Sequence, residues 1–282
     1  METHYLTTEM IADYQEYLFQ NERSERTIDK YIHDVTVFYH QLGSDKGIVK
    51  ETLIKWKDIL QIKNYAVATI NSMLAAVNGL CRFLGWEECC VNPLKQHRRI
   101  FRDRARELSR GEYVRLLKTA KQKKQHRLML VMETICSTGI RVSELQYITR
   151  QAVDNECAVV RCKGKSRTIL ISGELCVKLR AYCQKHGIEA GPIFLSKYGK
   201  PLNRSNIWAD MKKLCKDARV EPQKVFPHNL RHLFARLFYQ MEKDIAKLAD
   251  VLGHANIETT RIYIMESGVE HVRMISRLHL VL

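Results

Sequence analysis

The stretch LGHANIETTRIY at residues 252–263 contains a histidine directly after a glycine and a tyrosine nine residues further on. The preceding residues, IAKLADVLG, have an amphipathic pattern that predicts a helix ending at Gly253, because glycine readily adopts the left-handed conformation that closes a helix. Asn256 can cap the next helix. We therefore expect the His254 imidazole to lie in a short connection between two helices, where the backbone sets its direction.

Tyr263 falls nearly two turns into that second helix. A tyrosine at helical spacing usually fills a hydrophobic core. Its neighbours Ile262 and Ile264 can take the buried positions instead. In that case the phenol is free to point away from the core.

The stretch FPHNLRHLFARLFYQM at residues 226–241 predicts a helix with one apolar stripe. The stripe consists of Leu230, Leu233, Phe234, Leu237, Phe238 and Met241. His228, Arg231 and Ala235 fall together on one flank, which places an imidazole beside a guanidinium. His228 and His232 have the spacing of a metal-binding pair. The glutamate of H-E-x-x-H and a third ligand are missing, so we predict no metal site.

In the third stretch, STGIRVSEL, an arginine follows a glycine at the junction of two predicted helices. Glu144 lies about one turn after Arg141. The pair is either a surface ion pair of small energetic value or an arginine oriented by a carboxylate for binding an anion.

The charge of the chain is unevenly distributed. The formal net charge is +15, and residues 1–100 carry 12 Lys and Arg against 13 Asp and Glu. The whole basic excess therefore lies in residues 101–282. Such an excess favours a polyanionic partner, most often nucleic acid, over a merely solvated surface.

The apolar spacing in the first hundred residues predicts helices, such as ERTIDKYIHDVTVFY and ATINSMLAAVNGLCRFL. Asn92-Pro93 ends this pattern, and Ser109 with Glu112 forms a capping box that opens the next helix. We predict a helical domain at 1–94, a basic linker at 95–107 and a second domain at 108–282. The basic strip that we expect to contact DNA phosphates comprises Arg98, Arg99, Arg102 and Arg104.

Two β-rich runs, CAVVRC and RTILIS, are joined by the small turn KGKS and predict a hairpin. The chain after Asn203 has helical patterns again. The predicted fold class is therefore mainly α with a small antiparallel β-sheet, in which a helical N-terminal domain precedes an α+β domain.

The nine cysteines show no C-x-x-C pair and no zinc-ligand spacing, which favours free thiols in a reducing cytoplasm. The sequence has no uncharged apolar run of about 18 residues and no signal-peptide pattern, so we expect neither a membrane span nor secretion.

Four motifs in this order, TGIRVSEL, HNLRH, LGH and the tyrosine nine residues after the last histidine, resemble the tyrosine recombinase, or phage integrase, family. TIDKYIHDVTVFY and NPL resemble its helical core-binding domain, so the likeness covers nearly the whole chain. Within the family, the chain resembles compact members that lack an arm-binding domain, either Xer-like or from mobile elements.

The resemblance implies a site-specific recombinase that breaks and rejoins DNA through a covalent 3′-phosphotyrosyl intermediate and a Holliday junction. Tyr263 would be the nucleophile. Arg141 and Arg231 would hold the non-bridging phosphate oxygens, for which the fork geometry of guanidinium is suited. Phosphodiester bonds are conserved throughout, so neither ATP nor a metal cofactor is expected.

The resemblance assigns His228 to proton transfer with the tyrosine and His254 to hydrogen bonding of the phosphate. Lys163 on the hairpin would protonate the leaving oxygen, and Lys165 is its alternative and otherwise a DNA contact. Glu144 would orient its catalytic neighbours. A structural or supporting role is expected for His232.

The implied partners are double-stranded DNA and three further copies of the chain, as a homotetramer on two DNA sites. Exchange of a C-terminal helix between subunits and the participation of accessory proteins are further expectations, with a cytoplasmic, nucleoid-associated location. Two alternatives stay open at this point. They are a type IB topoisomerase-like enzyme and a catalytically silent DNA-binding protein on the same fold.

Overall fold

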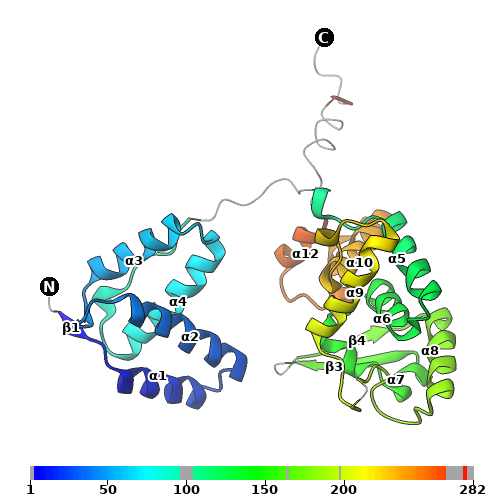
Figure 1. The fold of residues 1–282 in the computed structure, drawn as a ribbon, viewed down its shortest axis with the longest axis horizontal. Helices are drawn as coiled ribbons and strands as arrows, with labels where there is room; N and C mark the ends of the chain where they lie inside the picture. Colours follow the sequence, from blue (N-terminus) through cyan, green and yellow to red (C-terminus); the bar gives the residue numbers. More distant parts are fainter. Residues whose placement is uncertain (1–2, 96–103, 163–164, 197, 265–275, 278–282) are drawn as a thin grey trace. The chain divides into compact units, whose positions relative to one another are not determined.

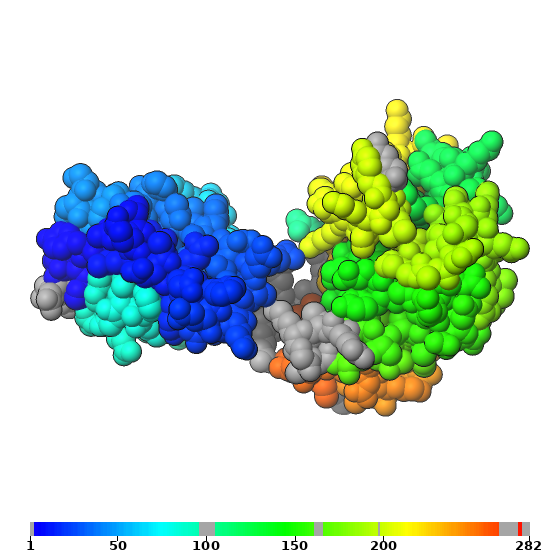
Figure 2. All heavy atoms as spheres, turned by 90° about the horizontal axis from the view of Figure 1, so that it is seen from below, coloured from blue at the N-terminus to red at the C-terminus, as the bar shows by residue number. Residues whose placement is uncertain are grey.

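The computed structural model describes residues 3–95, 104–162, 165–196, 198–264 and 276–277. The chain divides into two compact units, Met1–Arg98 and Arg99–Leu282, which Figures 1 and 2 colour from blue to cyan and from green to orange. Each unit has its own hydrophobic core. Residues 96–103 of the predicted linker lie outside the described residues, and the domain boundaries at 94 and 108 stay predictions.

The N-terminal unit is a bundle of helices. Its elements are α1 (Thr8–Gln20), α2 (Glu25–Gln41), α3 (Lys50–Ile62), α4 (Val67–Phe83) and the short 3-10 helix η1 (Glu87–Cys89). The apolar spacing predicted α2 and α4, and Val35, Phe38, Leu74 and Val77 of these helices are indeed buried in one core. Burial of each such side chain contributes ~1.5–3 kcal/mol to stability.

This unit also contains a small sheet that the sequence did not reveal. Strand β1 (His4–Tyr5) pairs antiparallel with β2 (Gly47–Ile48). Strands of two residues are too short to show an alternating apolar pattern, which needs at least four residues to be recognised.

The C-terminal unit surrounds its core with helices and one hairpin (Figure 1). Its elements are η2 (Arg104–Arg106), α5 (Arg110–Gln122), α6 (His126–Thr138), η3 (Val142–Tyr147), α7 (Arg150–Asp154), β3 (Cys157–Cys162), β4 (Lys165–Leu170), α8 (Gly173–His186), α9 (Arg204–Ala218), η4 (Pro222–Lys224), α10 (Pro227–Glu242), α11 (Ile245–Leu252) and α12 (Ile257–Ile264). Helix α10 packs against α6, α9, α11 and α12. The predicted fold class is confirmed, with a second small sheet added.

Helix ends in this unit follow the predicted capping residues. The Ser109 hydroxyl accepts from the Glu112 amide and the Glu112 carboxylate accepts from the Ser109 amide, which is the expected capping box. Gly139 and Gly253 close α6 and α11 in the left-handed conformation, each with φ of 64°. The Asn256 side chain accepts from the amide of Glu258 at 2.8 Å, so it caps α12 as predicted.

The hairpin β3–β4 is antiparallel, as predicted, and pairs Val160 with Arg167 and Ala158 with Ile169. Ala158, Val160 and Ile169 are buried. Because residues paired across a ladder point to the same face, Arg167 lies on the buried face of this small sheet.

Helix α10 corrects one part of the predicted apolar stripe. Leu230 and Leu233 are buried as predicted, but Met241 is 83% exposed. Met241 lies in the last turn of α10, just before Lys243 ends the helix in the left-handed conformation. The predicted apolar stripe of α10 therefore extends past the part of the helix that packs on the core.

Two further expectations concern the described residues as a group. All eight cysteines whose side chains are described are free thiols. Among the described helices, none combines the length and the apolar character that crossing a membrane requires.

Candidate active site

Helix α6 delivers the first arginine. The chain leaves α6 at Gly139, and Arg141 precedes η3, whose buried Glu144 accepts from the Arg141 amide at 2.8 Å. The other Glu144 oxygen accepts from the Arg141 guanidinium at 3.0 Å. The Arg141 side chain remains 40% exposed. Glu144 thus orients the arginine without covering it.

Glu144 also serves a second arginine. The Arg167 guanidinium, from β4, lies 2.5 Å from Glu144 Oε2. Burial opposes ionisation of Glu144, but the Arg141 amide and the Arg167 charge outweigh it and lower the pKa of Glu144 below its usual value. The carboxylate is therefore an anion shared by two guanidiniums.

Arg231 is a fully buried side chain on α10. Its guanidinium donates to the carbonyl of Gly139, to the carbonyl of Leu252 at 2.8 Å, and to Nε2 of His254 at 2.9 Å. Its Nε has no hydrogen-bond partner. No carboxylate forms an ion pair with Arg231 among the described residues. Main-chain carbonyls at the C-terminal ends of α6 and α11 therefore hold the Arg231 guanidinium in place. They do not neutralise its charge.

The electrostatic cost of this arrangement appears in the pKa of Arg231. Burial, and next the charge of Arg141, lower this pKa to about 10, so the guanidinium is still protonated at neutral pH. An isolated buried cation is costly unless an anion compensates it. The guanidiniums of Arg141 and Arg167 share the carboxylate of Glu144, whereas Arg231 has no ion pair among the described residues. The site is therefore suited to a further anion.

His254 follows the left-handed turn at Gly253, as predicted. Because a guanidinium can only donate, Nε2 of His254 must accept from Arg231, and Nδ1 must carry the proton. Nδ1 then donates to the hydroxyl of Thr260 at 2.8 Å. Burial, followed by the charges of Arg231 and Arg141, lowers the pKa of His254 to about 4. The imidazole is neutral at pH 7.

The low pKa of His254 makes stability dependent on pH. Between pH 4 and about 6.5 the unfolded chain binds a proton at this position and the folded protein does not, so stability falls as the pH decreases through this window. We expect the free energy of unfolding of the wild type to fall more steeply there than that of His254→Gln. Denaturant titrations at several pH values measure both slopes, and equal slopes would contradict the low pKa.

Thr260 anchors His254 to the helix that carries the tyrosine. Its side chain is fully buried, one turn before Tyr263 on α12. Thr260→Val keeps the shape but leaves Nδ1–H of His254 unpaired, which costs roughly 1–3 kcal/mol. We expect a lower melting temperature and a changed His254 tautomer in ¹⁵N NMR spectra. Thr259→Val on the same helix, at an exposed position, is the control that should change neither.

Tyr263 corrects the prediction that its isoleucine neighbour would be buried in its place. Tyr263 is 5% exposed, whereas Ile262 is 57% exposed. The phenol ring belongs to a small apolar cluster that joins α10, α11 and α12, and it stacks on the ring of His232 at 4.3 Å. The ring of Tyr263 therefore fills part of the core, and its hydroxyl is still available for the predicted chemistry.

The hydroxyl of Tyr263 nevertheless points to polar groups. It lies 3.4 Å from Nε2 of His228 and forms a side-chain hydrogen bond with Arg231. Since the guanidinium can only donate, the phenol oxygen accepts from Arg231 and its own proton is available to His228. The predicted nucleophile, the predicted base and a buried cation thus meet within one chain.

The structure does not describe the side chains of six of the predicted site residues. Lys163, Arg98, Arg99 and Arg102 lie outside the described residues. Arg104 begins η2 and Lys165 begins β4, and the main chain alone is described at both. Their predicted contacts with DNA stay predictions.

Sequence reasoning missed Arg167 and Thr260. Arg167 is two residues before the apolar Ile169 in β4 and so shares its face of the strand, and a cation on this inward face was the available signal. Thr260 has the i, i+3 relation to Tyr263, which places both on one face of α12. Neither pattern names the distant partner, Glu144 or His254.

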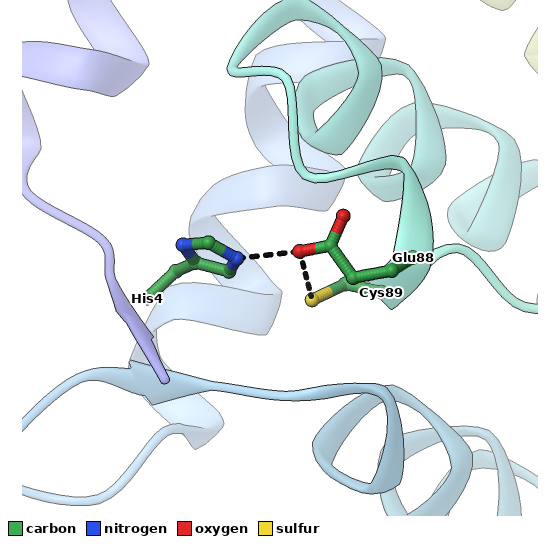
Figure 3. A group of neighbouring side chains, drawn as sticks. All are labelled: His4, Glu88 and Cys89. Atoms are coloured by element: carbon green, nitrogen blue, oxygen red, sulfur yellow. Dashed lines mark hydrogen bonds and ion pairs between the residues drawn. The ribbon is translucent and has the colours of Figure 1, made fainter. Parts of the chain in front are cut away.

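Among the described residues, one group of three side chains combines metal-ligand types. It lies in the N-terminal unit, where the imidazole of His4 and the thiol of Cys89 both contact the Glu88 carboxylate, at 2.5 and 3.9 Å (Figure 3). The His4 ring also stacks on Trp86. Burial, and next the charge of Glu88, raise the pKa of the Cys89 thiol, which disfavours the thiolate that a metal needs. We interpret the group as a tie between β1 and η1.

The model of the phage integrase family matches residues 106–268, and that of the phage integrase N-terminal SAM-like domain matches residues 11–88. The chain belongs to the phage integrase family. This integrase family member is 28% identical over 275 residues to tyrosine recombinase XerA of Thermococcus kodakarensis, covering 94% of this chain and 93% of the relative. It is 26% identical over 264 residues to tyrosine recombinase XerD of Halalkalibacterium halodurans, covering 85% and 87%.

Solved structures share its fold. A lambda integrase dimer bound to a COC' core site superposes with a TM-score of 0.74 at 17% identity, over 93% of this chain and 78% of that one. XerH recombinase bound to difH substrate superposes with a TM-score of 0.68 at 19% identity, over 96% and 84%. The family and its named relatives identify this integrase family member as a tyrosine site-specific recombinase, as the sequence predicted.

Proposed function

We propose that this recombinase breaks and rejoins double-stranded DNA through a covalent bond between Tyr263 and a 3′-phosphate, without ATP or metal. One observation carries the proposal. A fully buried guanidinium, that of Arg231, has no ion-pair partner among the described carboxylates and hydrogen-bonds to the tyrosine. A phosphodiester supplies the anion that this site lacks, and its tetrahedral oxygens suit guanidinium forks.

In the first step, the Tyr263 oxygen attacks phosphorus and the bond between phosphorus and the 5′-oxygen breaks. The phenol proton passes to His228, whose Nε2 lies 3.4 Å away. Charge that develops on the non-bridging oxygens is stabilised by Arg141 and Arg231. Preorganised cations in a desolvated site commonly supply the largest part of such catalysis.

His254 contributes to this step only after a phosphate has bound. In the DNA-free structure its Nε2 accepts from Arg231. A phosphate oxygen that takes over this N–H of Arg231 releases Nε2, and its negative charge favours protonation of the imidazole. The protonated His254 then donates to the phosphate. His232, which stacks on the Tyr263 ring, holds the nucleophile in place.

The departing 5′-oxygen needs a proton, which we assign to Lys163 on the β3–β4 hairpin. In the reverse step, the 5′-hydroxyl of the partner strand attacks the phosphotyrosyl group, and the Tyr263 oxygen leaves and regains its proton. Two such exchanges pass through a Holliday junction. Every phosphodiester bond that breaks is replaced, so the reaction needs no external energy source.

The assembly is also part of the proposal. Exchange of two strands in two duplexes requires four active sites, and we propose a homotetramer on two DNA sites, open to accessory proteins. The predicted exchange of a C-terminal helix concerns residues 265–275 and 278–282, outside the described residues. Lambda integrase bound to its core site and XerH recombinase bound to difH share this fold, which supports double-stranded DNA as the partner. The expected nucleoid-associated location in the cytoplasm stays a prediction.

The test is capture of the covalent adduct. The protein is incubated with DNA from the ends of its genetic element or with genomic fragments, denatured, and separated by electrophoresis. We expect a protein–DNA band that resists denaturant, with phosphotyrosine at Tyr263 in the peptide mass spectrum. Relaxation of supercoils without a preferred site would favour the topoisomerase alternative. Binding without any adduct would favour the silent DNA-binding alternative.

A further inference from the structure

Arg167 lies at a junction between two parts of the active site. It comes from β4, on the face of the hairpin that it shares with buried Val160 and Ile169. Its side chain is 13% exposed, so it is mostly withdrawn from solvent. Its two terminal nitrogens donate in two directions, to Glu144 and to the carbonyl of Val251.

The first direction leads to Arg141. The oxygen of Glu144 that Arg167 contacts at 2.5 Å also accepts from the amide of Arg141, and the other oxygen accepts from its guanidinium. A carboxylate with both oxygens engaged has one orientation. Arg167 therefore helps to set the direction in which Arg141 is presented.

The second direction leads to the turn that carries His254. Val251 is in the last turn of α11, and its carbonyl accepts from Arg167 at 3.0 Å. The next carbonyl, that of Leu252, accepts from Arg231. A Cβ at Gly253 would overlap the Cδ atom of Arg167, so this side chain packs directly on the turn. In Figure 2 the orange residues of this segment lie against green residues of the same unit.

We propose that Arg167 is a positioning residue that sets the distance between Arg141 and the pair formed by Arg231 and His254. This inference rests on the proposed function, because the distance matters for the phosphate that the three side chains would share. Arg167 acts through Glu144 and the Val251 carbonyl. A misplacement of reacting groups by about 1 Å can cost roughly 100-fold in rate.

Arg236 offers a matched control. It lies in the same unit, on α10, and it also donates to one carboxylate, Glu107, and to one carbonyl, that of Leu108. Its side chain is 25% exposed, and its Nε, like that of Arg167, has no hydrogen-bond partner. A merely structural contribution should be similar at the two positions.

The test compares Arg167→Gln, Arg167→Lys and Arg236→Gln in single-turnover formation of the adduct, on the DNA that the wild type links. We expect a fall of ~100-fold for Arg167→Gln and of ~10-fold for Arg167→Lys, which keeps the charge. DNA affinity should change much less than the rate. Arg236→Gln should lower the melting temperature and leave the rate of the folded protein within about twofold. Equal rate losses in the two glutamine variants would overturn the proposal.

A double variant tests the route of the effect. If Arg167 acts largely through Glu144, Arg167→Gln combined with Glu144→Gln should lose less than the product of the two single losses. Fully multiplicative losses would contradict this route.

One readout is independent of activity. The Arg167 charge contributes to the low pKa of His254, so Arg167→Gln should raise this pKa and shift the His254 ring signals in NMR spectra, whereas Arg236→Gln should leave them in place. Unchanged His254 signals would overturn the proposal even where no DNA substrate is found. Absence of an adduct in the wild type would instead count against the proposed function.

Discussion

Replacing Tyr263 with phenylalanine is expected to abolish covalent linkage to DNA and to leave folding and DNA binding nearly unchanged. The ring keeps its place in the cluster of α10, α11 and α12 and its stack on His232. The variant loses the oxygen that lies 3.4 Å from His228 and receives the Arg231 hydrogen bond. Without a nucleophile no phosphotyrosyl bond forms, so we expect a rate at least ~10⁴-fold lower.

Denaturing electrophoresis of the adduct and a gel-shift titration with the same DNA separate the two effects. Tyr239→Phe is the matched control, since Tyr239 is on α10 and packs partly buried against the same cluster. It should form the adduct at the wild-type rate. An adduct formed by Tyr263→Phe would show that another side chain is the nucleophile.

Arg231→Lys is expected to lower the rate of adduct formation by ~10³-fold and to destabilise the fold. A lysine keeps the charge, but its single ammonium group cannot reproduce the planar fork that contacts Gly139, Leu252 and His254 together. Each buried carbonyl left unpaired costs roughly 1–3 kcal/mol. Loss of one preorganised donor at the developing charge costs about 10²–10³ in rate.

Rates are compared for folded protein only, with circular dichroism and the melting temperature recorded for each variant. Arg236→Lys, one helical turn and a fraction further along α10, is the control. It should be destabilised without a matching loss of rate. An Arg231→Lys protein that forms the adduct within tenfold of the wild type would remove Arg231 from the proposed mechanism.

Much of the local structure could be predicted from the order of residue types. Apolar spacing in α2, α4 and α10 determined which faces are buried, because the helical period relates neighbours in the sequence to neighbours in space. The capping box of Ser109 and the glycines that end α6 and α11 act within a few residues. Features of this kind can be predicted from short stretches of sequence, because the residues that form them are close together in the chain.

The sequence also determined the family and the set of candidate residues. Arg141, His228, Arg231, His254 and Tyr263 stand in motifs whose order along the chain is readable without a structure. The roles of these residues remain proposals, and the variants above test them.

The tertiary structure alone decided how these residues are held. Arg167 meets Glu144 across 23 positions and the Val251 carbonyl across 84, and Arg231 meets Gly139 across 92. Periodicity places a side chain on a face, but it does not say which distant polar atom that face will meet. Burial of Tyr263 in place of Ile262 has the same cause, since packing of α12 against α10 and α11 selects the side chain that fits.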